Sequence, residues 1–278
     1  MKKTFFLIPL YVWTAVFVIF PLAMVFYFAF TQETSSGTVF TLSEFARIFD
    51  PMYIGVLLRS FKIAIISTLI CIFCGYPVAY ILARSKSKYK LIIIILILLP
   101  MWMNFLLRTY SWLSILENTG LINTLLVKLG FEKVHFLYNE GAVILGTVYN
   151  YIPFMIMPIY ITLLKLDESH LEAAADLGAN SVQAFLKVTL PFSVPGILSG
   201  VAMVFVPSVT TFVISQLMGG GKVPLIGDVI EQQFRVVNDW HFGSAISVIV
   251  MVIVLAFMYF INRGDVENNN GNGGRFLR

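Results

Sequence analysis

The chain has 278 residues, of which 58% are hydrophobic and only 12% are charged. Soluble globular domains carry on the order of 25% charged residues, so this composition excludes an ordinary soluble enzyme and indicates a protein embedded in a lipid bilayer. The net charge of +4 is modest and unevenly placed, which favours an orientation signal over a nucleic-acid-binding surface, and we expect no nucleic-acid partner.

Six apolar segments are long enough to cross a bilayer, which takes on the order of 20 residues each. Their approximate ranges are 5–30, 59–83, 90–108, 141–164, 194–218 and 241–262. The first segment exceeds the roughly 7 to 15 residues of a signal-peptide core, so we expect it to remain as a span. Residues 1–278 are therefore predicted to form one all-α membrane domain, with no separate soluble domain.

The orientation follows from the short loop between the second and third spans. Residues 84–90 carry four cations and no acid, which places this loop in the cytoplasm. Counting spans from there puts both termini and the long hydrophilic segment 165–191 on the cytoplasmic side. The tail 264–278 is rich in Asn and Gly, and we expect it to be disordered.

Short helices are predicted in the outer loops, and a break is predicted in the fifth span. Thr41 and Glu44 fit a capping box, and an apolar stripe beginning at Leu121 marks a second short helix that ends at Gly130. Pro207 is followed by several hydroxyl side chains, so it predicts either a broken helix that lines a pathway or a kink that improves packing.

Several functions are excluded by what the sequence lacks. Every Asp and Glu lies in a predicted loop or terminus, which argues against an ion-coupled secondary carrier, because such carriers use carboxylates inside the membrane. The run 219–222 lacks the spacing of a phosphate-binding loop. Two cysteines one helical turn apart and three isolated histidines support neither a metal site nor catalytic residues.

The hydrophilic segment 165–191 has the pattern of two short helices joined by a hinge. Ser169 and Glu172 fit a capping box for the first helix, and Gly178 suits a left-handed stop. Asn180 or Ser181 can cap the second helix. Small side chains in the first helix would let a partner approach its backbone closely.

This segment resembles the EAA motif of the permease subunits of bacterial ATP-binding-cassette (ABC) importers. The positions that match the motif are Glu172, Ala173, Ala174, Gly178, Val188, Leu190 and Pro191. The resemblance implies the MetI-like fold of type I importers in the bacterial inner membrane, with this segment docking on an ATPase. It also implies a second, non-identical permease subunit, two ATPase subunits that hold ATP and Mg, and an external binding protein. No cofactor and no catalytic residue are expected in this chain.

Further stretches, among them residues 99–112, 151–155 and 219–243, resemble the permeases of spermidine/putrescine importers, specifically the first of their two permease subunits. A polycation would be stabilised by aromatic faces, carbonyl oxygens and acids. The candidate path residues are Trp102, Asn104, Tyr110, Trp112, Tyr149, Asn150, Tyr151, Ser208, Thr211, Asp228 and Glu231. The aromatic residues also fit membrane-interface anchors, and the two acids also fit a helix cap.

One departure from the relatives concerns the fifth span, since many of them carry an acid shortly after its proline. Residues 208–211 hold none in this chain. Importers of another solute, such as iron(III), thiosulfate or an aminophosphonate, therefore stay open as alternatives.

Overall fold

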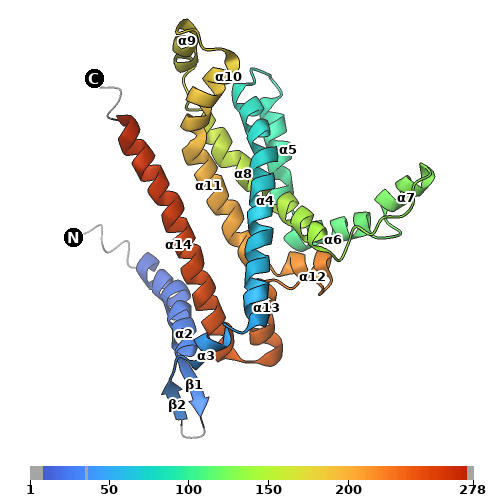
Figure 1. Cartoon of the computed structure of the whole chain (residues 1–278), viewed down its shortest axis with the longest axis vertical. Coiled ribbons are helices and arrows are strands. Elements are labelled where there is room, and N and C mark those ends of the chain that lie inside the picture. Colours follow the sequence, from blue (N-terminus) through green and yellow to red (C-terminus); the bar gives the residue numbers. More distant parts are fainter. Residues whose placement is uncertain (1–8, 35–36, 274–278) are drawn as a thin grey trace.

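The computed structural model describes residues 9–34 and 37–273, and it consists of long helices with a small hairpin at one end (Figure 1). Among the described residues, five helices are long and apolar enough to span a membrane: Pro9–Ala29, Pro51–Arg84, Glu140–Leu163, Ser181–Thr210 and Trp240–Ile261. A further helix pair, Lys90–Trp102 and Phe105–Lys128, passes the same test but is bent by 96°. The all-α membrane fold predicted from the sequence is confirmed, with up to 6 spans if the bent pair is one of them.

The chain crosses several times between the hairpin end and the opposite end (Figure 1). The first part of the chain contains η1 (Ala15–Ile19), α2 (Phe20–Ala29), β1 (Thr31–Thr34), β2 (Gly37–Phe40), α3 (Ser43–Arg47), α4 (Pro51–Arg84), α5 (Lys90–Trp102), α6 (Phe105–Leu116) and α7 (Leu121–Lys128). The second part contains α8 (Glu140–Leu163), α9 (Glu168–Asp176), α10 (Ser181–Ala184), η2 (Phe185–Thr189), α11 (Leu190–Thr210), α12 (Val213–Gly219), α13 (Ile226–Gln232), η3 (Gln233–Val237) and α14 (Trp240–Gly273).

Two of the π-helical turns have the same cause. Both η1 and η2 end two residues before a proline, Pro21 and Pro191 respectively. A proline ring clashes with the carbonyl four residues earlier and offers no N–H, so the helix widens over that turn instead of stopping. Neither proline ends its span, and each lies within a continuous helical run.

The third span differs from its prediction as one straight helix over 90–108. Helix α5 ends at Trp102, and α6 starts after Asn104, whose side chain accepts hydrogen bonds from the N–H groups of Leu106 and Leu107 at 2.8 and 3.3 Å. An asparagine in this position starts a new helix in a new direction. Hydropathy does not register the change, because the residues on both sides of the bend are apolar.

The segment 31–47, predicted to lie outside, also differs from its predicted structure. An antiparallel hairpin pairs Thr31 with Phe40, which the sequence analysis missed. The predicted capping box of Thr41 and Glu44 is wrong: Thr41 Oγ1 accepts a hydrogen bond from the N–H of Ser43, at 3.1 Å, and Leu42 is the N-cap residue. The carboxylate of Glu44 instead binds Arg47 at 2.6 Å, because an ion pair outweighs a neutral cap. The amphipathic helix predicted from Leu121 is confirmed as α7.

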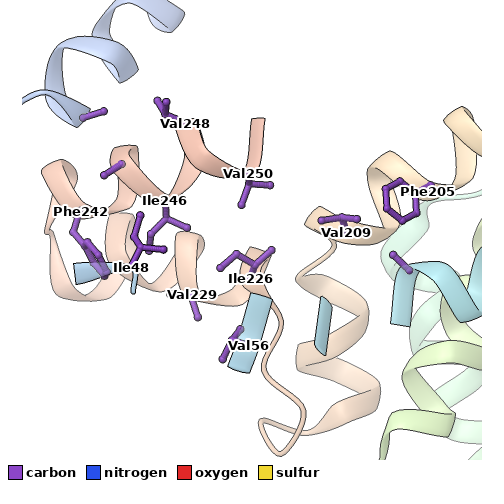
Figure 2. Close-up of a cluster of buried hydrophobic side chains, with 13 residues drawn as sticks. Ile48, Val56, Phe205, Val209, Ile226, Val229, Phe242, Ile246, Val248 and Val250 are labelled. Atoms are coloured by element: carbon purple, nitrogen blue, oxygen red, sulfur yellow. The ribbon is translucent and has the colours of Figure 1, made fainter. Parts of the chain in front are cut away.

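The core lies where α4, α8 and α11 pack together, with α14 joining at the hairpin end. Figure 2 shows this last cluster, in which Ile48 lies beside Phe242, and residues of α11, α13 and α4 complete the group. Buried side chains therefore hold α13 and the start of α14 against the main bundle. That placement fixes the short helices around which the site is built.

The disorder expected for the tail 264–278 stays a prediction. Helix α14 continues to Gly273. Residues 274–278, and the first four residues of the predicted first span, lie outside the described residues.

Candidate functional site

The hydrophilic segment between α8 and α11 forms two short helices at the end of the molecule opposite the hairpin (Figure 1). The first, α9, begins two residues earlier than predicted, because Asp167 is its N-cap and accepts a hydrogen bond from the N–H of Ser169 at 3.0 Å. The predicted capping box of Ser169 and Glu172 is therefore wrong. Hydrogen bonds from Ser169 lower the pKa of Asp167, which keeps this cap ionised.

The hinge between α9 and α10 has the predicted geometry. Gly178 has a φ of +80°, its N–H donates to the carbonyl of Ala175 at 2.8 Å, and Ala179 N–H donates to Ala174 at 3.0 Å. This pair of bonds is a Schellman motif, which satisfies the last carbonyls of a helix. Asn180 then caps α10 and forms a reciprocal capping box with Gln183. The hinge is held by its own backbone and needs no support from the rest of the chain.

This segment exposes aliphatic side chains around its hinge. Leu177 at the tip is 89% exposed, and Val182 and Leu186 are 65% and 53% exposed. Of the motif residues, Glu172, Ala173, Gly178 and Pro191 are exposed, while Ala174 and Leu190 are half-buried. Such a rigid hinge with exposed small and aliphatic side chains can dock into a groove of another protein.

Aromatic packing attaches this docking segment to the spans. Phe185 lies edge-on against Tyr76 and Tyr80 of α4, with ring centroids 5.8 and 5.5 Å apart. The hydroxyl of Tyr76 in turn lies 3.0 Å from that of Ser193 in α11. A movement imposed on α9 and α10 would therefore pass to two membrane helices at once.

The second part of the site lies where α11 ends. The helix runs through Pro207 without interruption and stops at Thr210, and Thr211 has extended backbone angles, so the break is real but falls four residues later than Pro207. Helix α13 packs against this end: a Cβ on Gly227 would collide with the carbonyl oxygen of Thr210. The buried N–H of Ile226 donates to Ser60 Oγ at 2.7 Å, which fixes α13 to α4.

Both predicted outer acids lie on α13. Asp228 accepts a hydrogen bond from the N–H of Leu225 at 2.7 Å with one oxygen, while its other oxygen is buried without a partner among the described residues. Burial raises the pKa of Asp228. Glu231 binds Arg235 at 3.0 Å and accepts a hydrogen bond from Gln216. The acids thus lie beside α12. Gly227, which precedes Asp228, packs against the end of α11, whose terminal carbonyls carry partial negative charge.

The structure does not bring the predicted aromatic residues together. Trp112 lies edge-on to Tyr149 at 5.2 Å, and Tyr149 also lines an apolar hollow of about 420 Å³ between α4 and α8. Trp102 and Tyr110 are 85% and 53% exposed. Of these candidates and Tyr151, only Tyr151 lies next to the break in α11, where it neighbours Thr211.

Some of the predicted polar residues have a structural role, whereas others have a polar atom without a partner among the described residues. Asn104 is used as a helix cap, and Ser208 is fully buried and donates to the carbonyl of Val204 at 2.6 Å. Asn150 is 1% exposed, and its Oδ1 has no partner among the described residues. Arg108, which was not among the predicted site residues, is 8% exposed and lies near Tyr151. The only sign of it in the sequence is a cation among apolar and aromatic neighbours.

Comparison with known proteins shows to which family this chain belongs. A family model described as "binding-protein-dependent transport system inner membrane component" matches residues 75–263. The chain belongs to this family. It is 41% identical over 254 residues to the spermidine/putrescine transport system permease protein PotB of Salmonella typhimurium, covering 90% of this chain and 88% of that protein. The PotB of Escherichia coli is 40% identical, with 90% and 92% covered.

The fold of this binding-protein-dependent permease also matches a solved structure. A crystal structure of a bacterial ABC transporter involved in alginate import contains a chain with a TM-score of 0.81 and 17% identity, covering 96% of this chain and 95% of that one. The chain is thus a membrane-spanning permease subunit of an ABC importer. Family membership agrees with the sequence-based argument against an ion-coupled carrier.

Proposed function

We propose that this permease is the first of two different permease subunits in an importer for polyamines of the spermidine and putrescine type. The observation that carries the proposal is the identity of 41% over 90% of the chain with permeases named for that solute. In this proposal the complex also contains a second, non-identical permease chain, two ATPase subunits that bind ATP and Mg, and an external polyamine-binding protein. It lies in the bacterial inner membrane.

The docking segment α9–α10 is the coupling element of the proposal and faces the cytoplasm. The cationic loop 84–90 supports this side, because the positive-inside rule places it in the cytoplasm and it lies at the same end as α9. Lys86 of that loop lies 3.8 Å from Glu168 of α9. Both termini are then cytoplasmic as well. Movement of the ATPase subunits on ATP binding would pull α4 and α11 through Phe185.

The solute path of the proposal passes the end of α11. A polyammonium ion crossing the membrane needs negative charge at depth, and unwound helix ends supply carbonyl oxygens for cations in many transporters. Asp228 adds a carboxylate next to these carbonyls, although no acid follows Pro207 in the chain. Thr211 and Tyr151 add hydroxyl groups at the same level.

The test is uptake of labelled spermidine and putrescine by the complete complex in liposomes, with its binding protein, with and without ATP. We expect uptake that requires ATP, stops with vanadate and is not competed by thiosulfate, iron(III) or an aminophosphonate. Absence of ATP-dependent polyamine uptake, with a competent binding protein present, would refute the solute assignment. Competition by one of the other solutes would replace it.

A further inference from the structure

A hollow of about 650 Å³ opens at the hairpin end of the molecule, between the end of α2, strand β1 and the start of α14. It is separate from the acids of α13 and from the docking segment. Its walls are formed by Met24, Phe28, Glu33, Val237, Asn238, Asp239, Trp240 and His241. None of the functions derived above uses these residues.

One wall of the hollow is aromatic. The ring of Phe28 lies 6.0 Å from that of Trp240 and 5.5 Å from that of His241. Phe234 supports Trp240 from another side at 5.5 Å, and Trp240 remains 50% exposed. A half-exposed indole held in place by packed neighbours offers its face to a cation at little entropic cost.

The other wall carries negative charge. Asp239 binds Arg47 at 3.0 Å, and Arg47 also binds the buried Glu44, so these three side chains together hold one net negative charge. Glu33 on strand β1 is exposed and has no ion pair within the described part of the chain, which makes it a second negative charge. The residues that line the hollow include no lysine or arginine.

His241 adds an acceptor between these walls. Its Nδ1 lies 3.1 Å from the carbonyl oxygen of Phe28, which can only accept, so Nδ1 carries the proton of that bond. In the neutral ring, Nε2 is then left as an acceptor. An aromatic face, a free carboxylate and an imidazole acceptor are together the recognition chemistry of an alkylammonium group, which donates three hydrogen bonds and bears a positive charge.

We propose that this hollow is a binding site for the ammonium end of an aliphatic amine at the outer mouth of the importer. The choice of a polyamine as its ligand rests on the proposed function. The site receives one amine of the solute by contact with Trp240 and Glu33. The solute then moves inward to the acids of α13.

Equilibrium binding of labelled putrescine and spermidine to the complete complex in nanodiscs tests this site. The informative variants are Glu33→Gln and Trp240→Leu, and Trp240→Phe retains an aromatic face as a conservative control. Loss of one cation–π contact should weaken binding roughly 2- to 30-fold, while the phenylalanine variant should stay within about threefold of the wild type. Glu132→Gln is the matched control, because it removes an exposed acid of the outer segments that does not line the hollow.

Wild-type affinity in both Glu33→Gln and Trp240→Leu would overturn the proposal, as would an equal loss in Glu132→Gln. Wild-type amine affinity combined with poor capture of the second permease or the binding protein would mean that the hollow is a protein interface, and would also overturn it. Uptake assays separate this from the proposed function. ATP-dependent polyamine uptake that is unchanged in both variants would support the proposed function and refute the binding site. Amine binding that depends on Trp240, in a complex without polyamine uptake, would support the binding site and refute the proposed function.

Discussion

Gly178→Asp should abolish ATP-dependent uptake while the chain stays folded in the membrane. Gly178 has a φ of +80°, and this left-handed conformation costs a non-glycine residue about 1–2 kcal/mol. The added Cβ would meet no atom of this chain within 4 Å. The cost is small against a typical stability of about 5–15 kcal/mol, so a complete loss of uptake must come from a partner that approaches this surface.

The assay compares uptake, ATP hydrolysis and the amount of complex in the membrane for each variant. Gly130 provides a matched control, because it has a φ of +85° and an added Cβ would also meet open space. It follows α7, far from the docking segment α9–α10. Gly130→Asp introduces the same charge and the same strain, so its uptake should stay near that of the wild type. Normal uptake in Gly178→Asp, or an equal loss in Gly130→Asp, would refute the reasoning.

Three further predictions concern the tip, the acid of α13 and a buried ion pair. Leu177→Ser should leave the thermal stability unchanged but weaken co-purification of the ATPase on the order of tenfold or more, because burying a leucine contributes about 1.5–3 kcal/mol. Asp228→Asn keeps an acceptor for the N–H of Leu225 and should raise the KM for polyamine about tenfold, a loss of about 1.4 kcal/mol. Since burial raises the pKa of Asp228 and a cation needs the ionised form, wild-type uptake should fall on acidification at a higher pH than an ordinary aspartate would impose, and the asparagine variant should lack this step. Arg47→Met leaves Glu44, which is 2% exposed, without its partner and should lower stability by about 1–3 kcal/mol in thermal unfolding, with partial recovery on adding Glu44→Gln.

The hinge of the docking segment α9–α10 could be predicted from the sequence, because it depends on interactions between residues close together in the chain. A glycine that stops one helix and an asparagine that caps the next act within three or four residues, and both are found at Gly178 and Asn180. The start of α9 was placed wrongly for the same reason. Asp167 and Ser169 can both cap, they lie two residues apart, and only the observed hydrogen bond decides between them.

The direction of the helices and the pairing of distant residues could not be predicted, because hydropathy gives no information about either. Residues 90–108 read as one apolar run, although the chain turns at Asn104. The ion pair between Arg47 and Asp239 joins residues that are 192 positions apart, and no local pattern relates them. The outer hollow depends on such pairings, which is why its residues were absent from the predicted path.

Residues 208–211 hold no acid, and the packing of α13 against the end of α11 therefore bears on the proposed solute path. Because Gly227 has no side chain, α13 can approach until its backbone meets the carbonyls of Thr210 and Thr211. The next residue, Asp228, accepts a hydrogen bond from the N–H of Leu225, which holds its carboxylate at the start of α13. A substitution at Gly227 would move that carboxylate away without touching any charge. In the proposed solute path, an acid on α13 takes the place of an acid inside the fifth span, and its position depends on Gly227.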